Sequence, residues 1–188
     1  MKQAIIVHCW GGGPDYCWYP QTKKELEDLG FSVQVPAMPD TENPKLDAWL
    51  SALKGVVEAP TENLYLIGHS AGCITIMRYL ETLPSNTQIG GVVFVAGFTD
   101  DLGFEEIKTF FREPLDFEKI KSAAKKFVAI HSDNDPYVAL RYGDILKEKL
   151  GAEVIVKNNA GHFSGPVDDE GSCLSLPEVA ESIRKMPV

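Results

Sequence analysis

The sequence predicts a single α/β domain in which a parallel sheet of about six strands is covered by helices on both faces, giving three layers. Two observations predict this class. Short apolar, β-branched runs alternate with segments of helical hydrophobic period along the whole chain, which is the pattern of βαβ units. The runs are almost continuously apolar, as in parallel strands buried on both faces. Because 188 residues is the length of one domain, we expect a single domain over 1–188.

The elements follow from the period of the apolar residues and from the residues that end helices. Six segments are predicted as strands: Gln3–His8, Phe31–Pro36, Asn63–Gly68, Gly91–Ala96, Phe127–His131 and Glu153–Lys157. Five segments with helical spacing are predicted as helices: Gln21–Leu29, Lys45–Val57, Ala71–Leu83, Arg141–Leu150 and Leu176–Met186. Pro84 ends the third of these helices and Gly151 ends the fourth.

The stretch 98–125 is the least regular part of the chain. It is rich in Phe and acidic residues, and it contains Pro114 without a sustained period. We interpret it as an irregular excursion over the edge of the sheet, near the functional site. Its aromatics, Phe104, Phe110 and Phe111, either cap an apolar pocket or pin a long loop, and the second role is the commoner one.

Composition and charge exclude several classes of protein. The formal net charge is −9 and the basic residues are scattered, which disfavours nucleic acid and anionic membrane as partners. The four cysteines form no CxxC pair, so neither a metal nor another cofactor is expected, and reduced thiols indicate a cytoplasmic protein. The run Gly11–Gly13 lacks the spacing of a nucleotide-binding loop. No protein partner is indicated.

The strongest local signal is the GxSxG pattern Gly68-His69-Ser70-Ala71-Gly72. It comes directly after an apolar strand and directly before a predicted helix. This context is the nucleophile elbow, in which flanking glycines permit a sharp strand-to-helix turn that exposes the serine hydroxyl. The sequence therefore predicts Ser70 as a catalytic nucleophile.

A serine nucleophile needs a base and an acid, which follow it in the order Ser, Asp or Glu, His. His162 lies just after the last predicted strand, in Asn159–Phe163, and is predicted as the general base. The turn after the fifth strand offers two carboxylates, Asp133 and Asp135. We favour Asp135 as the triad acid, because it lies near the loop tip beside Pro136, whereas Asp133 suits a role in bracing the turn.

Acyl transfer also needs donors for an oxyanion. The backbone N–H of Ala71, directly after the nucleophile, is one predicted donor. The second is predicted in the glycine-rich turn after the first strand, with the N–H of Trp10 favoured and that of Cys9 as the alternative. Four side chains are candidates for the substrate pocket, and for His69 among them packing is the competing role: Cys9, His69, Phe98 and Phe163.

Taken together, these residues resemble the small serine hydrolases typified by the retinoblastoma-binding protein nine family, also called YdeN-like hydrolases. The resemblance rests on the elbow and on several further motifs: Trp18-Tyr19-Pro20, Ala37-Met38-Pro39-Asp40, Met77-Arg78-Tyr79, Ser132–Pro136 and Gly161-His162-Phe163. It implies a minimal α/β-hydrolase fold without a separate cap domain, and the triad Ser70, Asp135 and His162. It departs from many hydrolases at Cys9, where they have glycine.

The functional expectation is a carboxylesterase-like enzyme that cleaves small carboxylic esters through an acyl-enzyme. Amide or peptide bonds are alternative substrates, because the triad chemistry is shared. The competing hypothesis from another class is a non-catalytic or regulatory protein that uses the hydrolase fold to bind a ligand or a protein. Three catalytic residue types in the right order favour the enzyme.

Overall fold

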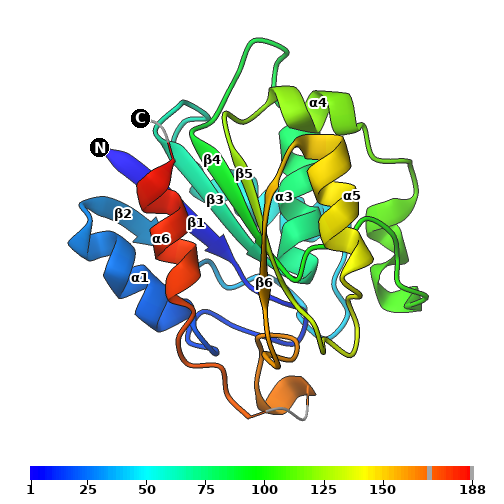
Figure 1. The fold of residues 1–188 in the computed structure, drawn as a ribbon. Coiled ribbons are helices and arrows are strands. Elements are labelled where there is room, and N and C mark those ends of the chain that lie inside the picture. The colour runs from blue at the N-terminus through cyan, green and yellow to red at the C-terminus, as the bar shows by residue number, and fades with distance from the viewer. Residues whose placement is uncertain (169–170, 187–188) are drawn as a thin grey trace.

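The computed structural model describes residues 1–168 and 171–186. Its centre is one sheet of six parallel strands in the order β2-β1-β3-β4-β5-β6 (Figure 1). The strands are β1 (Lys2–Val7), β2 (Phe31–Gln34), β3 (Leu64–His69), β4 (Gly91–Val95), β5 (Phe127–Ser132) and β6 (Glu153–Lys157). The direction of winding reverses between β1 and β3, and in such sheets ligands bind at the carboxyl ends of the strands beside this reversal.

Helices cover both faces of this sheet. On one face, α1 (Tyr19–Asp28) and α6 (Pro177–Lys185) contact each other in front of the strands in Figure 1. The other face is covered by a chain of contacting helices: α2 (Leu46–Val56), α3 (Ala71–Glu81), α4 (Phe117–Ser122) and α5 (Arg141–Leu150). The predicted three-layer class is confirmed, and no separate cap domain stands over the described part of the chain.

The burial of the strands explains why continuous apolar runs predicted them from the sequence. Every residue of β3, β4 and β5 is buried, as are five of the six residues of β1. The outer strands β2 and β6 are only partly buried, because each has a neighbour on one side alone. Continuous apolar runs therefore belong to the inner strands, as expected for a parallel sheet.

The excursion 98–125 is more regular than predicted. It contains the 3₁₀ helix η1 (Glu105–Phe111) and the helix α4, neither of which the sequence pattern indicated. The side chain of Asp116 accepts a hydrogen bond from the backbone N–H of Lys119 at 3.0 Å and thereby caps α4. A six-residue helix is too short to show a hydrophobic period, so only its capping residue, Asp116, could have indicated it in the sequence.

Arg78 on α3 holds this excursion against the helix layer. Its guanidinium is mostly buried, pairs with Glu81 at 2.8 Å, and donates to the backbone oxygens of Phe110 at 2.8 Å, Pro114 at 3.3 Å and Glu113. Several donors of one planar group are therefore satisfied together, which a buried charge requires. The segment is attached to the helix that follows the elbow.

Helix α3 crosses β1 at Gly72, and this contact has no room for a side chain. A Cβ built at residue 72 would lie 2.1 Å from the carbonyl oxygen of Val7, which is backbone and cannot swing away. We expect Gly72→Ala to lower the free energy of unfolding by about 2–4 kcal/mol, through overpacking. Urea denaturation followed by circular dichroism measures the change.

Gly55 provides the matched control, because it is a helical glycine of α2 with nothing within 4 Å of a built Cβ. Gly55→Ala should leave stability unchanged or raise it by up to about 1 kcal/mol, since alanine has the higher helix propensity. Equal effects of the two substitutions would contradict the proposed crowding at Gly72.

His131 makes the fold sensitive to acid. Its imidazole is fully buried at the end of β5, and within residues 1–168 and 171–186 neither ring nitrogen has a hydrogen-bond partner. Burial lowers the pKa of His131 to about 4, against the opposing effect of Asp135 and Asp144. The unfolded chain binds this proton below about pH 6.5 and the folded chain does not, so stability falls as the pH drops from 6.5 towards 4.

We expect His131→Leu to flatten this dependence. For each pH unit below about 6.5, the wild type should lose about 1.4 kcal/mol of unfolding free energy more than the variant, the equivalent of one proton. Urea midpoints measured from neutral pH to about pH 4.5 test this. Parallel pH curves for the two proteins would show that His131 does not carry the acid sensitivity.

Candidate active site

The turn from β3 to α3 holds Ser70 in a strained backbone conformation. Ser70 has φ 53° and ψ −117°, a region that residues other than glycine rarely adopt. Its N–H donates to the carbonyl of Val95 at 2.9 Å, and its own carbonyl accepts from the N–H of Cys73 at 2.8 Å. A Cβ at Gly68 would lie 2.7 Å from the backbone of Cys73. Both glycines of the GxSxG pattern are therefore required by close backbone contacts, as the elbow interpretation expects.

His162 and Asp135 form a buried pair at the carboxyl edge of the sheet. The His162 Nδ1 lies 2.9 Å from Asp135 Oδ2 and 3.1 Å from Oδ1, and the two side chains are 5% and 1% exposed. A carboxylate can only accept, so Nδ1 carries the proton and donates it. In this tautomer the neutral ring has its lone pair on Nε2, which is the arrangement that a general base needs.

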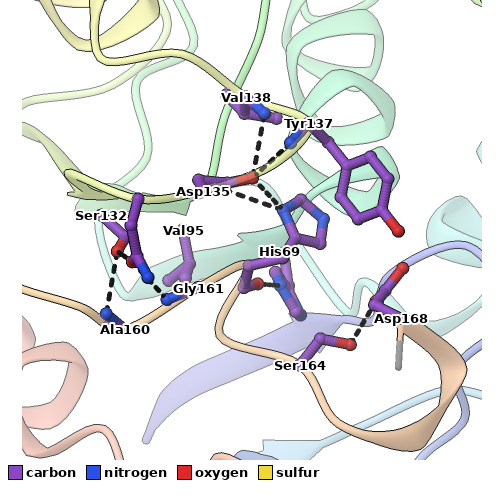
Figure 2. A network of polar contacts seen from close by, with 12 residues as sticks. His69, Val95, Ser132, Asp135, Tyr137, Val138, Ala160, Gly161, Ser164 and Asp168 are labelled. Atoms are coloured by element: carbon purple, nitrogen blue, oxygen red, sulfur yellow. Dashed lines mark hydrogen bonds and ion pairs between the residues drawn. The ribbon is translucent and has the colours of Figure 1, made fainter. Parts of the chain in front are cut away.

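Asp135 is held as an anion by its surroundings. Burial by itself raises the pKa of the Asp135 carboxyl. The hydrogen bond and charge of His162, together with the backbone N–H groups of Val138 and Tyr137, outweigh this effect, so the pKa is lowered. Both amides donate to Oδ1 at 2.9 Å, as Figure 2 shows. Asp135 is thus oriented as well as charged.

The turns that follow β5 and β6 are joined by hydrogen bonds of side chains to backbone. The Oδ1 of Asn134 accepts from the N–H of Gly161 at 2.8 Å, and the Oγ of Ser132 accepts from that of Ala160 at 3.0 Å (Figure 2). These contacts fix the loop that carries His162 against the loop that carries Asp135. The sequence analysis had not identified Ser132 and Asn134 in this role.

Asp133, the alternative acid, has a different position. It is exposed, and its Oδ1 accepts from the N–H of Asn159 at 2.8 Å, which braces the same pair of turns. The structure therefore brings Asp135, and not Asp133, to His162.

The peptide between Cys9 and Trp10 is fixed on its carbonyl side. Met38 donates its N–H to His8 Nε2 at 3.0 Å, so the ring proton of neutral His8 lies on Nδ1, which donates to the carbonyl of Cys9 at 2.8 Å. The N–H of Gly12 donates to the same carbonyl at 3.2 Å. In a trans peptide the N–H points opposite to the carbonyl. Anchoring the Cys9 oxygen therefore fixes the direction of the Trp10 N–H.

The remaining amides of this turn distinguish the two predicted donors. The Cys9 N–H already donates to Tyr19 Oη at 3.0 Å, and that of Gly11 donates to Thr41 at 3.0 Å. By contrast, the N–H groups of Trp10 and Ala71 have no acceptor within the described residues, and both residues line one cavity. Two unpartnered amides facing one cavity are what an oxyanion site requires. Cys9 itself has no positive φ, so its side chain fits where many hydrolases have glycine.

The cavity has a volume of about 320 Å³, near the lower limit for small-ligand sites. It lies where Ser70 and His162 meet the turn after β1 and the excursion 98–125. Its lining consists of Cys9, Trp10, Gly11, Glu42, Ser70, Ala71, Phe98, Leu102, Phe104, Ile107, Tyr137, His162, Val167 and Asp168.

Two of the four predicted pocket side chains line this cavity and two do not. Cys9 and Phe98 line it, and burial raises the pKa of the Cys9 thiol to about 12, so the thiol is neutral. The prediction was wrong for His69 and Phe163, which are fully buried behind the cavity. Phe163 turns inward because its backbone has φ 57° and its N–H bonds back to Ala160.

The aromatics of the excursion take both of the roles considered. Phe104 lines the cavity and packs edge-on against Trp10, with ring centroids 5.7 Å apart. Phe110 is buried against Trp49, and Phe111 packs against Phe98. The excursion therefore forms one wall of the cavity, and part of it serves only to anchor that wall.

The charged groups of the lining are all acidic. Glu42 and Asp168 contribute carboxylates, and among the residues that the structure describes no Lys or Arg lines the cavity. Asp168 accepts a hydrogen bond from Ser164 (Figure 2). The Oγ of Ser164 also lies 3.0 Å from Tyr16 Oη. Neither acid was identified from the sequence, because single carboxylates in loops carry no motif.

The described residues contain neither a metal-binding cluster nor a membrane-spanning helix. No group of three His, Cys, Asp or Glu side chains is placed to hold a metal ion. No helix in residues 1–168 and 171–186 is long and apolar enough to cross a membrane. The four cysteines are free thiols.

Known proteins resemble this chain in sequence over nearly its full length. A family model described as serine hydrolase matches residues 4–172. The chain is 33% identical over 179 residues to YdeN of Bacillus subtilis (strain 168), covering 95% of this chain and 92% of YdeN. It is 31% identical over 166 residues to the serine hydrolase RBBP9 of Rattus norvegicus, covering 86% and 87% of the two chains.

Solved structures agree with the sequence comparison. The crystal structure of the ydeN gene product from B. subtilis has a TM-score of 0.89 at 31% identity, over 98% of this chain and 97% of that one. Est1E from Butyrivibrio proteoclasticus, solved with ferulic acid bound, has a TM-score of 0.73 at 14% identity over 98% and 87%, a likeness of fold alone. The resemblance predicted from the motifs is confirmed, and this chain belongs to the serine hydrolase family.

Proposed function

We propose that the protein hydrolyses small carboxylic esters through an acyl-enzyme on Ser70, with His162 as general base and Asp135 as the residue that orients it. The observation that carries this proposal is that Ser70, in its strained turn, and His162, bonded to a buried carboxylate, line the same cavity. A strained backbone is retained where the surrounding structure enforces it, most often at functional sites.

The reaction follows from the atoms at hand. Ser70 Oγ bonds to the acyl carbon while its proton passes to His162 Nε2, and the carbonyl electron pair moves to oxygen. The N–H groups of Ala71 and Trp10 receive that oxyanion. As the carbonyl re-forms, the ester C–O bond breaks and His162 gives its proton to the leaving alcohol. Water then repeats the attack on the acyl-enzyme and releases the carboxylic acid.

The cavity favours a small substrate of defined charge. A volume of about 320 Å³ suits a short acyl or aryl group, and its walls are largely aromatic and aliphatic. The carboxylates of Glu42 and Asp168 would repel an anionic substrate, because no cation lines the cavity to compensate them. We therefore propose neutral short-chain esters as the preferred class, and amides as slower substrates of the same machinery.

The nucleophile and base are tested by labelling and turnover. A fluorophosphonate probe should label the wild type stoichiometrically, and Ser70→Ala and His162→Ala should abolish both labelling and hydrolysis of p-nitrophenyl acetate. Gel fluorescence and absorbance measure the two readouts. Ester turnover that survives Ser70→Ala would overturn the proposal, and a folded wild type that neither labels nor hydrolyses esters would favour a binding protein.

The identity of the acid is tested by a matched pair of substitutions. In Asp135→Asn the side-chain oxygen stays with the N–H groups of Tyr137 and Val138, and the NH2 group faces His162 Nδ1. This favours the wrong tautomer of His162, so kcat should fall by roughly 10³-fold or more. Asp133→Asn keeps an oxygen for the N–H of Asn159 and should change kcat by less than about threefold. Steady-state kinetics on one ester measures both. A larger loss in the Asp133 variant would reverse the assignment.

A further inference from the structure

A chain of buried hydrogen bonds runs behind the cavity from the turn after β1 to the loop of His162. The N–H of Cys9 donates to Tyr19 Oη at 3.0 Å, and Tyr19 Oη lies 2.6 Å from His69 Nδ1. His69 Nε2 lies 2.8 Å from the backbone carbonyl of His162 (Figure 2). The side chains of Tyr19 and His69 are both fully buried.

The direction of each hydrogen bond in this chain is determined. The carbonyl of His162 can only accept, so His69 Nε2 carries the ring proton and donates it. His69 Nδ1 is then an acceptor and receives the hydroxyl proton of Tyr19, whose oxygen accepts the N–H of Cys9. Burial, with the nearby His162 ring, lowers the pKa of His69 to about 3, and burial raises that of Tyr19 well above its usual value. Both groups stay neutral during turnover, so the chain transmits geometry and not charge.

The ends of the chain are the two parts of the site that must keep a fixed separation. At one end, the Cys9 N–H precedes the peptide that presents the Trp10 N–H. At the other end, the accepting carbonyl belongs to His162 itself. His69 lies between them as the residue directly before Ser70, so its backbone is part of the elbow.

Packing alone does not account for these residue types. Two buried polar side chains without mutual partners would cost stability, and an apolar pair of similar shape would fill the space without that risk. Trp18 already packs against both rings, edge-on to Tyr19 with ring centroids 4.7 Å apart and tilted against His69 with centroids 5.6 Å apart. The hydrogen bonds of Tyr19 and His69 therefore fix the orientation of the groups that they join, which apolar packing does not.

We propose that Tyr19 and His69 are positioning residues for the hydrolytic reaction, and that their hydrogen bonds hold the oxyanion turn in register with the general base. This inference rests on the proposed function of Ser70 and His162. It assigns a reaction role to His69, for which the sequence had suggested either the pocket wall or packing.

Tyr19→Phe tests this role with the smallest change, because it removes one oxygen and keeps the ring. We expect kcat for a p-nitrophenyl ester to fall by roughly tenfold to a hundredfold, with little change in KM, since a small misplacement of reacting groups is enough for such a loss. The inhibition constant of a boronic acid, whose tetrahedral adduct places an oxyanion at the site, should rise by the same factor as kcat/KM falls.

His69 is tested by a pair that separates polarity from size. His69→Gln keeps one donor for the His162 carbonyl and one acceptor for Tyr19, whereas His69→Leu keeps neither. We expect His69→Gln to retain more kcat and tighter boronic acid binding than His69→Leu. If His69→Leu does not fold, Tyr19→Phe and His69→Gln carry the test.

Tyr79→Phe is the control, because it also removes a phenol oxygen, from a tyrosine of α3 that is only 4% exposed and does not line the cavity. It should leave kcat and the inhibition constant unchanged, whatever its effect on the melting temperature. If the wild type is active and Tyr19→Phe stays within about twofold of it in kcat and in the inhibition constant, the positioning role is overturned. The proposed function would still stand. An inactive, unlabelled wild type would overturn the proposed function and this inference with it.

Discussion

The site depends on the close approach of α3 to β1. Because Gly72 lies directly against the carbonyl of Val7, the first turn of α3 lies beside the turn that follows β1. The amide of Ala71 and the amide of Trp10 can then face one cavity although more than sixty residues separate them in the chain. A side chain at residue 72 would separate the two donors before it touched any catalytic group. The steric requirement of one glycine thus sets how closely the turn after β1 approaches the start of α3.

Parallel strands supply the rest of the arrangement. β3, β5 and β6 all end at the same edge of the sheet, so the turns that carry Ser70, Asp135 and His162 meet there. Asp135 and His162 lie in turns that are joined to each other, because Ser132 and Asn134 accept hydrogen bonds from the backbone of the turn before His162. The precision of the site comes from hydrogen bonds that connect loops across strands, and it does not require the loops to be rigid by themselves.

The inner strands and the turn that carries Ser70 could be predicted from the sequence because each has a local pattern. Continuous apolar runs marked the inner strands, and the GxSxG pattern marked the elbow. Helix α4, the inward turn of Phe163 and the carboxylate of Asp168 in the cavity had no such pattern, since each depends on contacts between distant segments. His69 was assigned to the pocket because it precedes Ser70, yet its buried side chain bonds to Tyr19 and to the carbonyl of His162 and does not line the cavity.

The attachment of the excursion 98–125 has a consequence for how such enzymes can diverge. Arg78 binds this segment through the carbonyl oxygens of Phe110, Glu113 and Pro114, atoms that every amino acid possesses. Side chains of the segment can therefore be replaced without loss of the attachment, while Phe104 and Ile107, which line the cavity, change with them. Selection can thus remodel this wall of the cavity independently of Ser70 and His162, because Arg78 binds the backbone of the wall and not its side chains.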